Sequence, residues 1–128
     1  MFADPILKMM AVGYLLTVSM ELPVLMAGLS RRHAASHRIF AGFWLTACTY
    51  PVVWLVLPPL FESRTWYLIV AETFAPLGEC LIFYLAFIRG KPNCRRDTVQ
   101  DMVTITVANL ISFGLGEVFN RSVGWEWL

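Results

Sequence analysis

The chain has 128 residues, of which 58% are hydrophobic and only 15% are charged. Soluble domains normally carry about 25% charged residues, so this composition is typical of a protein embedded in a membrane. The formal net charge of +1 gives no indication of a nucleic-acid partner, and we expect none. The length predicts a single domain over residues 1–128.

Four apolar segments follow one another, at about residues 6–29, 39–60, 66–88 and 98–119. Each is long enough to cross about 30 Å of hydrocarbon at about 1.5 Å per residue. The first lacks a basic leading region and a cleavage site, so we expect it to stay in the mature protein. Asp97 and Gln100 resemble a capping box that opens the fourth segment. The sequence predicts an all-α integral membrane protein with four transmembrane helices and no room for a soluble catalytic domain.

Basic residues gather in two of the three connections between the predicted segments. Seven of the ten Lys and Arg residues lie there: Arg31, Arg32 and Arg38 in the first connection, and Arg89, Lys91, Arg95 and Arg96 in the third. The positive-inside rule predicts that both connections lie in the cytoplasm and both termini on the opposite side. We therefore expect a multi-pass protein of the inner (plasma) membrane whose helices form two tandem hairpins in the same orientation.

The two predicted hairpins resemble each other, which indicates a tandem repeat of residues 6–60 and 66–120. Glu21 and Glu79 each precede the first arginine of the following basic connection by ten residues. Polar pairs with a spacing of three residues then recur on the returning helices, as Thr46 and Thr49 and as Asn109 and Ser112. The alternative is that membrane hairpins resemble one another because their composition is so restricted.

Four glutamates interrupt the apolar segments: Glu21, Glu72, Glu79 and Glu117. A carboxylate at the centre of a bilayer costs roughly 3 kcal/mol even on lenient scales, so it is usually paired, protonated or directed at a cavity. Ten residues of helix place Glu21 and Glu79 about 15 Å from the cytoplasmic boundary, near the bilayer midplane. We expect Glu72 closer to the outer leaflet and Glu117 at the outer interface, where water reaches it.

The remaining candidate site residues supply further oxygen atoms near these carboxylates. Thr46, Thr49 and Asn109 are predicted at a similar depth and Ser112 nearer the outer leaflet, although hydrogen bonding between helices would explain them equally well. A proline inside a helix frees the carbonyl four residues before it, and Pro23, Pro51 and Pro76 are placed to do so. Hard oxygen ligands suit a proton or a cation. We therefore predict an ion- or ligand-binding site that comprises Glu21, Glu72, Glu79, Thr49, Asn109 and Ser112.

Three further residues, His33, His37 and Cys94, lie in the basic connections and would suit a soft metal ion. They follow no fixed ligand spacing. The alternative is that both histidines belong to a basic surface that faces lipid headgroups. The sequence gives no firm prediction of a metal or a cofactor.

The first functional hypothesis is a small transporter or channel for a cation or a proton-coupled solute, with Glu21 and Glu79 as its central site. The second is a non-catalytic membrane subunit whose buried glutamates meet cationic groups of a larger complex. The third, a lipid-handling enzyme that uses the carboxylates as acid and base, has no sequence motif behind it. Besides the lipid bilayer, we expect a homo-oligomer or a larger complex, with small residues at helix contacts: Gly28, Gly42, Gly114 and Gly116.

Overall fold

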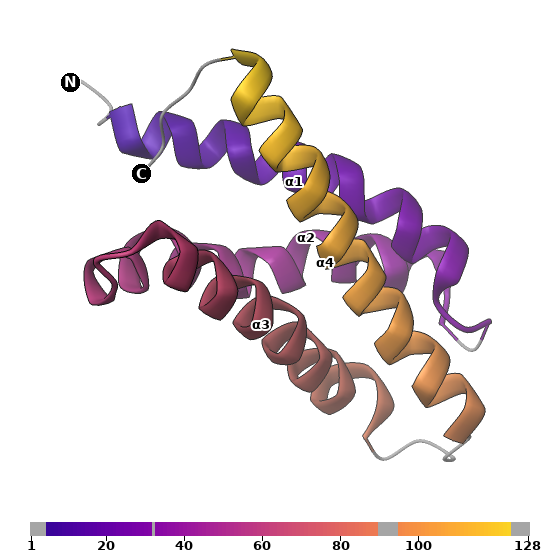
Figure 1. Ribbon diagram of the computed structural model, residues 1–128. Helices are drawn as coiled ribbons and strands as arrows, with labels where there is room; N and C mark the ends of the chain where they lie inside the picture. The colour runs from indigo at the N-terminus through magenta and orange to yellow at the C-terminus, as the bar shows by residue number, and fades with distance from the viewer. Residues whose placement is uncertain (1–4, 32, 90–94, 124–128) are drawn as a thin grey trace.

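The computed structural model (Figure 1) describes residues 5–31, 33–89 and 95–123, and the regular structure in these ranges is entirely helical. The main helices are α1 (Pro5–Gly28), α2 (Ala35–Pro51), α3 (Arg64–Phe83) and α4 (Arg95–Val123). Short helical turns extend two of them: η1 (Val52–Val56) and η2 (Pro58–Leu60) follow α2, and η3 (Tyr84–Ile88) follows α3. The prediction of an all-α chain is confirmed, and four helical stretches are long and apolar enough to cross a membrane: Leu7–Gly28, Ala35–Leu60, Arg64–Ile88 and Arg95–Val118.

The second helical stretch departs from the predicted uniform helix over residues 39–60. It begins at Ala35, and after Pro51 it widens into the π-helical turn η1 before the 3₁₀ turn η2. Pro51 has no N–H to donate to the carbonyl of Ala47, so one α-helical hydrogen bond is missing where α2 ends and η1 begins. The adjacent Pro58 opens the 3₁₀ turn.

The predicted capping box at the start of the fourth helix is wrong. Helix α4 begins at Arg95, which places Asp97 in its first turn rather than before it. A carboxylate there still interacts favourably with the positive end of the helix dipole. Gln100 instead reaches another helix, where its Nε2 donates to the carbonyl oxygen of Gly28 at 2.9 Å.

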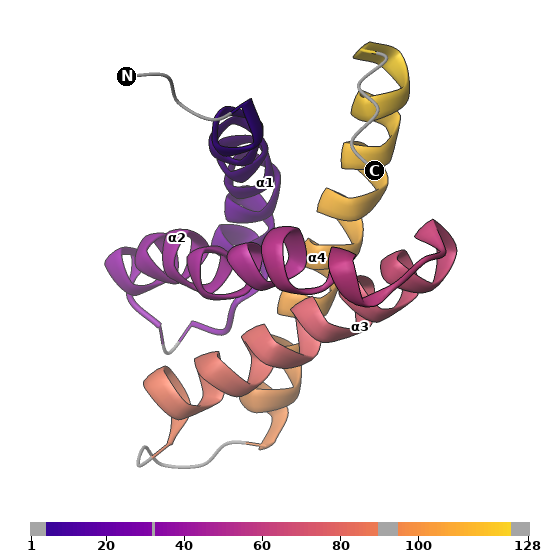
Figure 2. The same cartoon turned by 90° about the vertical axis from the view of Figure 1, so that its left-hand side faces the viewer.

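The four main helices contact one another in a ring. Helix α1 packs against α2 and α4, and α3 packs against the same two helices. The end of α1, the start of α2, the end of η3 and the start of α4 lie towards one end of the molecule, and the start of α1 and the end of α4 lie towards the other (Figure 1). Figure 2 shows α1 at the upper left, α2 and α3 below it, and α4 running behind α3 from the lower part of the view to the upper right. The ring therefore leaves α1 and α3 facing each other across its centre.

Apolar side chains from all four helices close the ring near the connections that follow α1 and η3. This cluster comprises Leu25, Leu29, Ala41, Leu45, Phe83, Phe87, Ile88, Ile105 and Ala108. Large apolar side chains also cover the outside, where Leu77, Leu81 and Leu110 are 65%, 59% and 55% exposed. Monomeric soluble proteins rarely expose apolar surface on this scale. The outer surface of the chain is thus largely apolar, whereas several polar side chains are buried.

Two of the glycines expected to contact other chains are used inside this one. A Cβ at Gly28 would lie 2.6 Å from Cγ2 of Thr104, and a Cβ at Gly42 would lie 2.6 Å from Cδ1 of Leu22. These glycines therefore let α1 approach α4 and α2 closely. A Cβ at Gly114 or Gly116 would meet nothing within 4 Å.

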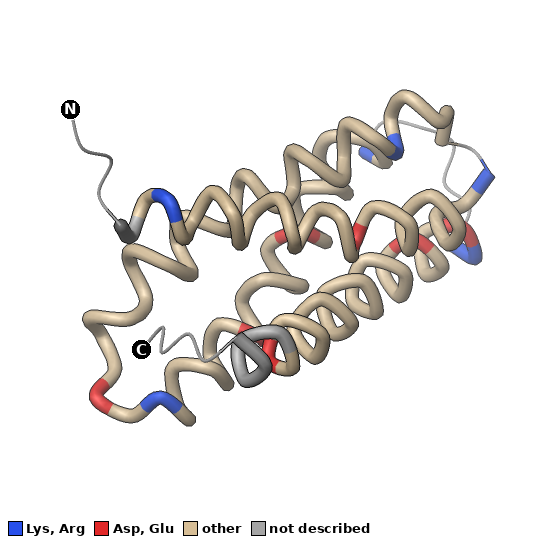
Figure 3. The backbone as a smooth tube through the Cα atoms, turned by 90° about the horizontal axis from the view of Figure 1, so that it is seen from above, with Lys and Arg blue, Asp and Glu red and all other residues tan. Residues whose placement is uncertain are grey.

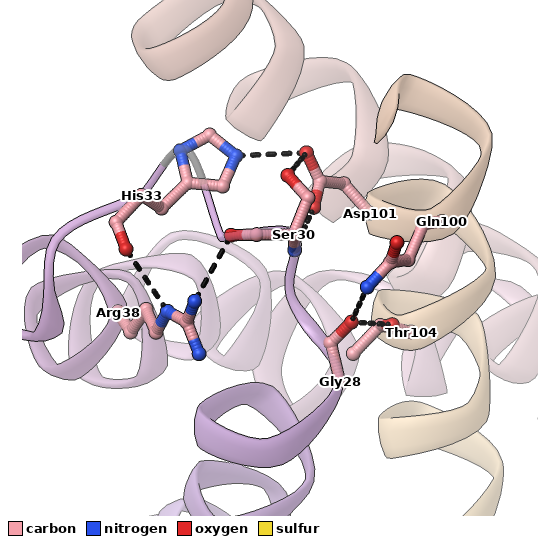
Figure 4. A network of polar contacts seen from close by, with 7 residues as sticks. All are labelled: Gly28, Ser30, His33, Arg38, Gln100, Asp101 and Thr104. Carbon is pink, nitrogen blue, oxygen red and sulfur yellow. Dashed lines mark hydrogen bonds and ion pairs between the residues drawn. The ribbon is translucent and has the colours of Figure 1, made fainter. Parts of the chain in front are cut away.

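A buried polar network fastens the connection after α1 to α4 (Figure 4). Asp101, which is fully buried, accepts hydrogen bonds from the backbone N–H of Ser30 at 2.7 Å and from its hydroxyl at 3.1 Å. His33 Nε2 lies 2.7 Å from the same carboxylate. Arg38 donates to the carbonyl oxygens of Met26, Ser30 and His33 at 2.6, 3.0 and 3.1 Å. A guanidinium at this position satisfies carbonyl groups that the end of α1 leaves without helical partners.

Candidate functional site

A cavity of about 460 Å³ lies between the four helices. Every polar residue that the sequence placed in or beside the central layer lines it: Glu21, Thr46, Thr49, Glu72, Glu79, Asn109 and Ser112. Arg64 and Glu117, at the start of α3 and towards the end of α4, line it as well. The apolar cluster around Leu45 and Phe83 closes the opposite end. The structure thus brings the predicted site residues together around one cavity.

Glu21 projects into this cavity from α1 and is only 2% exposed. The hydroxyl of Thr46 on α2 donates to its Oε2 at 3.1 Å. The hydroxyl of Ser112 on α4 donates to its Oε1 at 3.3 Å. Glu21 is therefore held by both helices that flank α1 in the ring.

Glu79 projects into the same cavity from α3 and is 4% exposed. The hydroxyl of Thr49 on α2 donates to its Oε2 at 3.4 Å. The amide of Asn109 on α4 also lies close enough to interact with this carboxylate, and its nitrogen donates to the carbonyl oxygen of Ile105 at 3.0 Å. Each of the two glutamates is thus contacted by one polar side chain from α2 and one from α4.

The carboxylates of the cavity lie close enough for their charges to interact. Glu79 is within electrostatic range of both Glu21 and Glu72, and the half-buried Glu72 lies nearer than Glu79 to the start of α3. In the described part of the chain, the Lys and Arg residues lie towards the two ends of the molecule. The charged residues in its middle are acidic (Figure 3). A proton or a cation at Glu21 and Glu79 would therefore meet oxygen ligands, since Arg64, a positive side chain in the cavity lining, lies at the start of α3 and is paired with Glu117.

Glu117, which was expected at the outer interface, forms an ion pair that the sequence analysis did not predict. Arg64 Nη2 lies 3.1 Å from Glu117 Oε1, and the two side chains are 45% and 22% exposed. The pair joins α3 to α4 at the end of the cavity away from the apolar cluster. Ion pairs exposed to this degree contribute little to stability.

An aromatic wall between this ion pair and the deep glutamates was also not predicted. Tyr50 follows Thr49 directly, and its ring stacks on that of Trp54 with the centroids 5.7 Å apart and the planes at 30°. Tyr67 on α3 and Phe113 on α4 line the same cavity. The helical spacing of Tyr50 and Trp54, four residues apart on one face, was the available sequence signal.

The candidate metal ligands do not come together among the described residues. His33 is buried against Asp101 rather than directed at lipid headgroups, so that interpretation is wrong for this residue. His37 is exposed, with its ring 5.8 Å from that of Phe87. Cys94 lies outside the described residues. Within those residues, no group of three His, Cys, Asp or Glu side chains is placed to hold a metal ion.

No protein-family model matches this chain, and no curated protein or solved structure is significantly similar to it. The functional proposal below is therefore based on the residues that line the cavity. Two buried carboxylates in one cavity, each beside a threonine hydroxyl of α2, can hold a proton, a cation, or each in turn.

Proposed function

We propose that the chain is a small membrane transporter or channel for a cation or a proton-coupled solute, with Glu21 and Glu79 as its central site. The observation behind this proposal is that both carboxylates are buried at the end of the cavity next to the apolar cluster. Burying an ionised carboxylate is costly, so such groups in a membrane are typically retained for a function.

The proposed setting is the inner membrane, crossed four times, with the two basic connections in the cytoplasm and both termini outside. The four long apolar helices and the exposed leucines on their outer surface support this placement. Blue Lys and Arg segments gather at the proposed cytoplasmic end (Figure 3). By position in the chain, Arg31 and Arg38 lie close to the end of α1 and the start of α2, and Arg89, Arg95 and Arg96 lie close to the end of η3 and the start of α4. This distribution is the one that the positive-inside rule requires.

We further propose that the chain consists of two tandem hairpins related by an internal repeat. Glu21 is contacted by Thr46 of its own hairpin and Ser112 of the other. Glu79 is contacted by Asn109 of its own hairpin and Thr49 of the other. If Thr46 is matched with Asn109 and Thr49 with Ser112, exchange of the two halves converts the first set of partners into the second, which supports the proposed repeat. A parallel repeat with its site at the interface is a common transporter arrangement.

In the proposed cycle, the two carboxylates hold one proton between them when no cation is bound. A cation that enters from the open end displaces this proton, which leaves to water through the cavity. The hydroxyls of Thr46 and Thr49 remain as neutral oxygen ligands. A bound proton lowers the affinity of the carboxylate pair for the cation, and a bound cation lowers its affinity for the proton. Occupancy by one therefore opposes occupancy by the other.

The alternative of a non-catalytic subunit receives less support from the geometry. A subunit whose glutamates meet cationic groups of a partner would direct them at the outer surface. Glu21 and Glu79 instead face the interior of their own chain, where Thr46, Thr49 and Ser112 satisfy them. Assembly into a homo-oligomer or a larger complex stays compatible with this arrangement.

The proposal is tested by flux in proteoliposomes that contain the purified chain. Internal pH is followed with a trapped dye while Na⁺ or K⁺ gradients are imposed, for the wild type and for Glu21→Gln and Glu79→Gln. We expect cation-driven proton movement in the wild type and a loss of at least about tenfold in each variant, because glutamine cannot exchange a proton. The matched control is Glu62→Gln, an exposed glutamate outside the cavity. Equal flux in all four proteins contradicts the proposal.

A further inference from the structure

We infer that the cavity binds an organic ammonium ion with an aromatic body, with its nitrogen at Glu21 and Glu79 and its ring against Tyr50 and Trp54. This inference rests on the proposed function and names the class of solute that the same site would accept. It follows from the size of the cavity, the chemistry of its wall and the order of its charges.

The size of the cavity is far greater than a bare inorganic ion requires. Its volume of about 460 Å³ lies within the range of about 300–1,000 Å³ that is typical of sites for small organic molecules. A single Na⁺ or K⁺ held by the two carboxylates would leave most of this space unfilled. A molecule with an apolar body in addition to its charge fills it better.

The wall of the cavity is aromatic on the side where the body of such a molecule would lie. Tyr50 and Trp54 present stacked rings from α2 and η1, with centroids 5.7 Å apart. Tyr67 faces them from α3, with its hydroxyl turned to the carbonyl oxygen of Val53 at 2.7 Å. Phe113 completes the wall from α4. Rings in this setting contact a flat ligand ring in stacked or edge-on geometry and also attract a nearby cation.

The order of groups along α3 places charge and apolar surface at different depths. Arg64 lies at the outer end, Tyr67 one turn further in, then Glu72, and finally Glu79. Along α2 and η1, Trp54 lies five residues beyond Thr49, the donor to Glu79, which at about 1.5 Å per residue is about 7.5 Å along the helix axis. An elongated ligand can therefore touch the deep carboxylates with one end and the aromatic wall with the other.

The charges of the lining select a cation over a neutral or anionic molecule. Glu21, Glu72 and Glu79 line the cavity, while Arg64 is already paired with Glu117 at 3.1 Å. A primary ammonium has three N–H donors, which match the carboxylate oxygens of the deep pair and the hydroxyl oxygen atoms beside them. An alcohol of the same shape would supply one donor and no charge.

The test is a binding series on the full-length purified protein in detergent, measured by isothermal titration calorimetry. The probes are 4-phenylbutylammonium, the neutral 4-phenylbutanol, and the small cation tetramethylammonium. We expect the first to bind at least about tenfold more tightly than either of the others, since only it has both the charge and the ring. Binding of the alcohol with equal affinity overturns the inference, and so does equal binding of tetramethylammonium.

Two pairs of variants locate the bound probe. The double variant with Glu21→Gln and Glu79→Gln should bind 4-phenylbutylammonium at least about tenfold more weakly than the wild type. The control variant Glu62→Gln should bind it with unchanged affinity. Trp54→Leu should weaken it by about fivefold, whereas Trp66→Leu, at a tryptophan that is 62% exposed, should not. Thermal unfolding of each variant checks that it is folded. If the folded Trp54→Leu protein binds the probe as tightly as the wild type, the ring does not lie where we place it.

The two proposals fail in different ways. Glutamate-dependent proton flux driven by Na⁺ or K⁺, without binding of 4-phenylbutylammonium, overturns the ligand class and leaves the proposed function in place. Glutamate-dependent binding of the probe, without any flux in proteoliposomes, supports the ligand class and contradicts the transport function.

Discussion

Glu21 and Glu79 project from helices on opposite sides of the ring, yet each accepts a hydrogen bond from a threonine of α2. The two threonines, Thr46 and Thr49, are three residues apart and lie on one face of that helix. A rotation or bend of α2 would therefore change the surroundings of both carboxylates at once. Pro51 and the π-helical turn that follows it lie directly beyond this face, where helices commonly bend.

The hydrogen bond between Thr46 and Glu21 is expected to stabilise the bundle. In Thr46→Val the shape is kept and one donor to the buried carboxylate is lost, so we predict a loss of about 1 kcal/mol in the free energy of unfolding. Denaturation in mixed micelles measures it. The control is Thr73→Val, because the exposed Thr73 hydroxyl bonds only to Ile69 of its own helix, at 2.8 Å. An equal effect of the two substitutions would show that the interhelical bond contributes nothing.

Asp101 is expected to contribute more than any exposed acidic residue. Asparagine at this position would keep the size of the side chain but direct an amide N–H₂ at the Ser30 or His33 donors. We predict that Asp101→Asn lowers the free energy of unfolding by about 2–3 kcal/mol, because a buried, charge-assisted network is broken. Asp97→Asn, in the first turn of the same helix, should cost about 0.5 kcal/mol. Denaturation in mixed micelles measures the free energy of unfolding of both variants. Comparable decreases for Asp101→Asn and Asp97→Asn would refute the role of the network.

The membrane topology is tested by labelling with an impermeant thiol reagent in whole cells. In a background with Cys48, Cys80 and Cys94 replaced by serine, Glu62→Cys should react from outside, since Glu62 is exposed in the connection between η2 and α3. Arg89→Cys, exposed at the other end of the molecule, should react only after the membrane is opened. The reverse pattern would invert the orientation, and reaction of both in intact cells would rule out a spanning arrangement.

The sequence predicted the depth of the site residues but not the directions in which they point. Rise per residue from the basic connections placed Glu21, Glu79, Thr49 and Asn109 in one layer, and all of them line one cavity. Depth does not determine which faces of the helices meet, because that depends on packing contacts such as Gly28 against Thr104. The pairing of Glu21 with Ser112, 91 residues away, therefore emerges only from the structure.

Other features escaped prediction because their signals have common alternative explanations. Asp101 lies one turn after Asp97 near a helix start, where carboxylates usually face water, yet it is fully buried against His33. Trp54 was interpreted as part of an interfacial aromatic belt, and Tyr50, in the middle of the predicted segment 39–60, had no feature that set it apart. The change to a π-helical turn after Pro51 was not predicted, because prolines are tolerated within membrane helices.

Carbodiimide labelling examines whether Glu21 and Glu79 form a single exchangeable site. Dicyclohexylcarbodiimide reacts with protonated carboxyl groups in apolar surroundings, and peptide mass spectrometry locates the adduct. We predict labelling at Glu21 or Glu79 that slows when Na⁺, K⁺ or 4-phenylbutylammonium occupies the cavity, whereas labelling of the exposed Glu62 should not respond to any of these cations. If both cavity glutamates stay unlabelled, or react at the same rate with and without every cation, then neither carboxylate exchanges a proton for a bound ion.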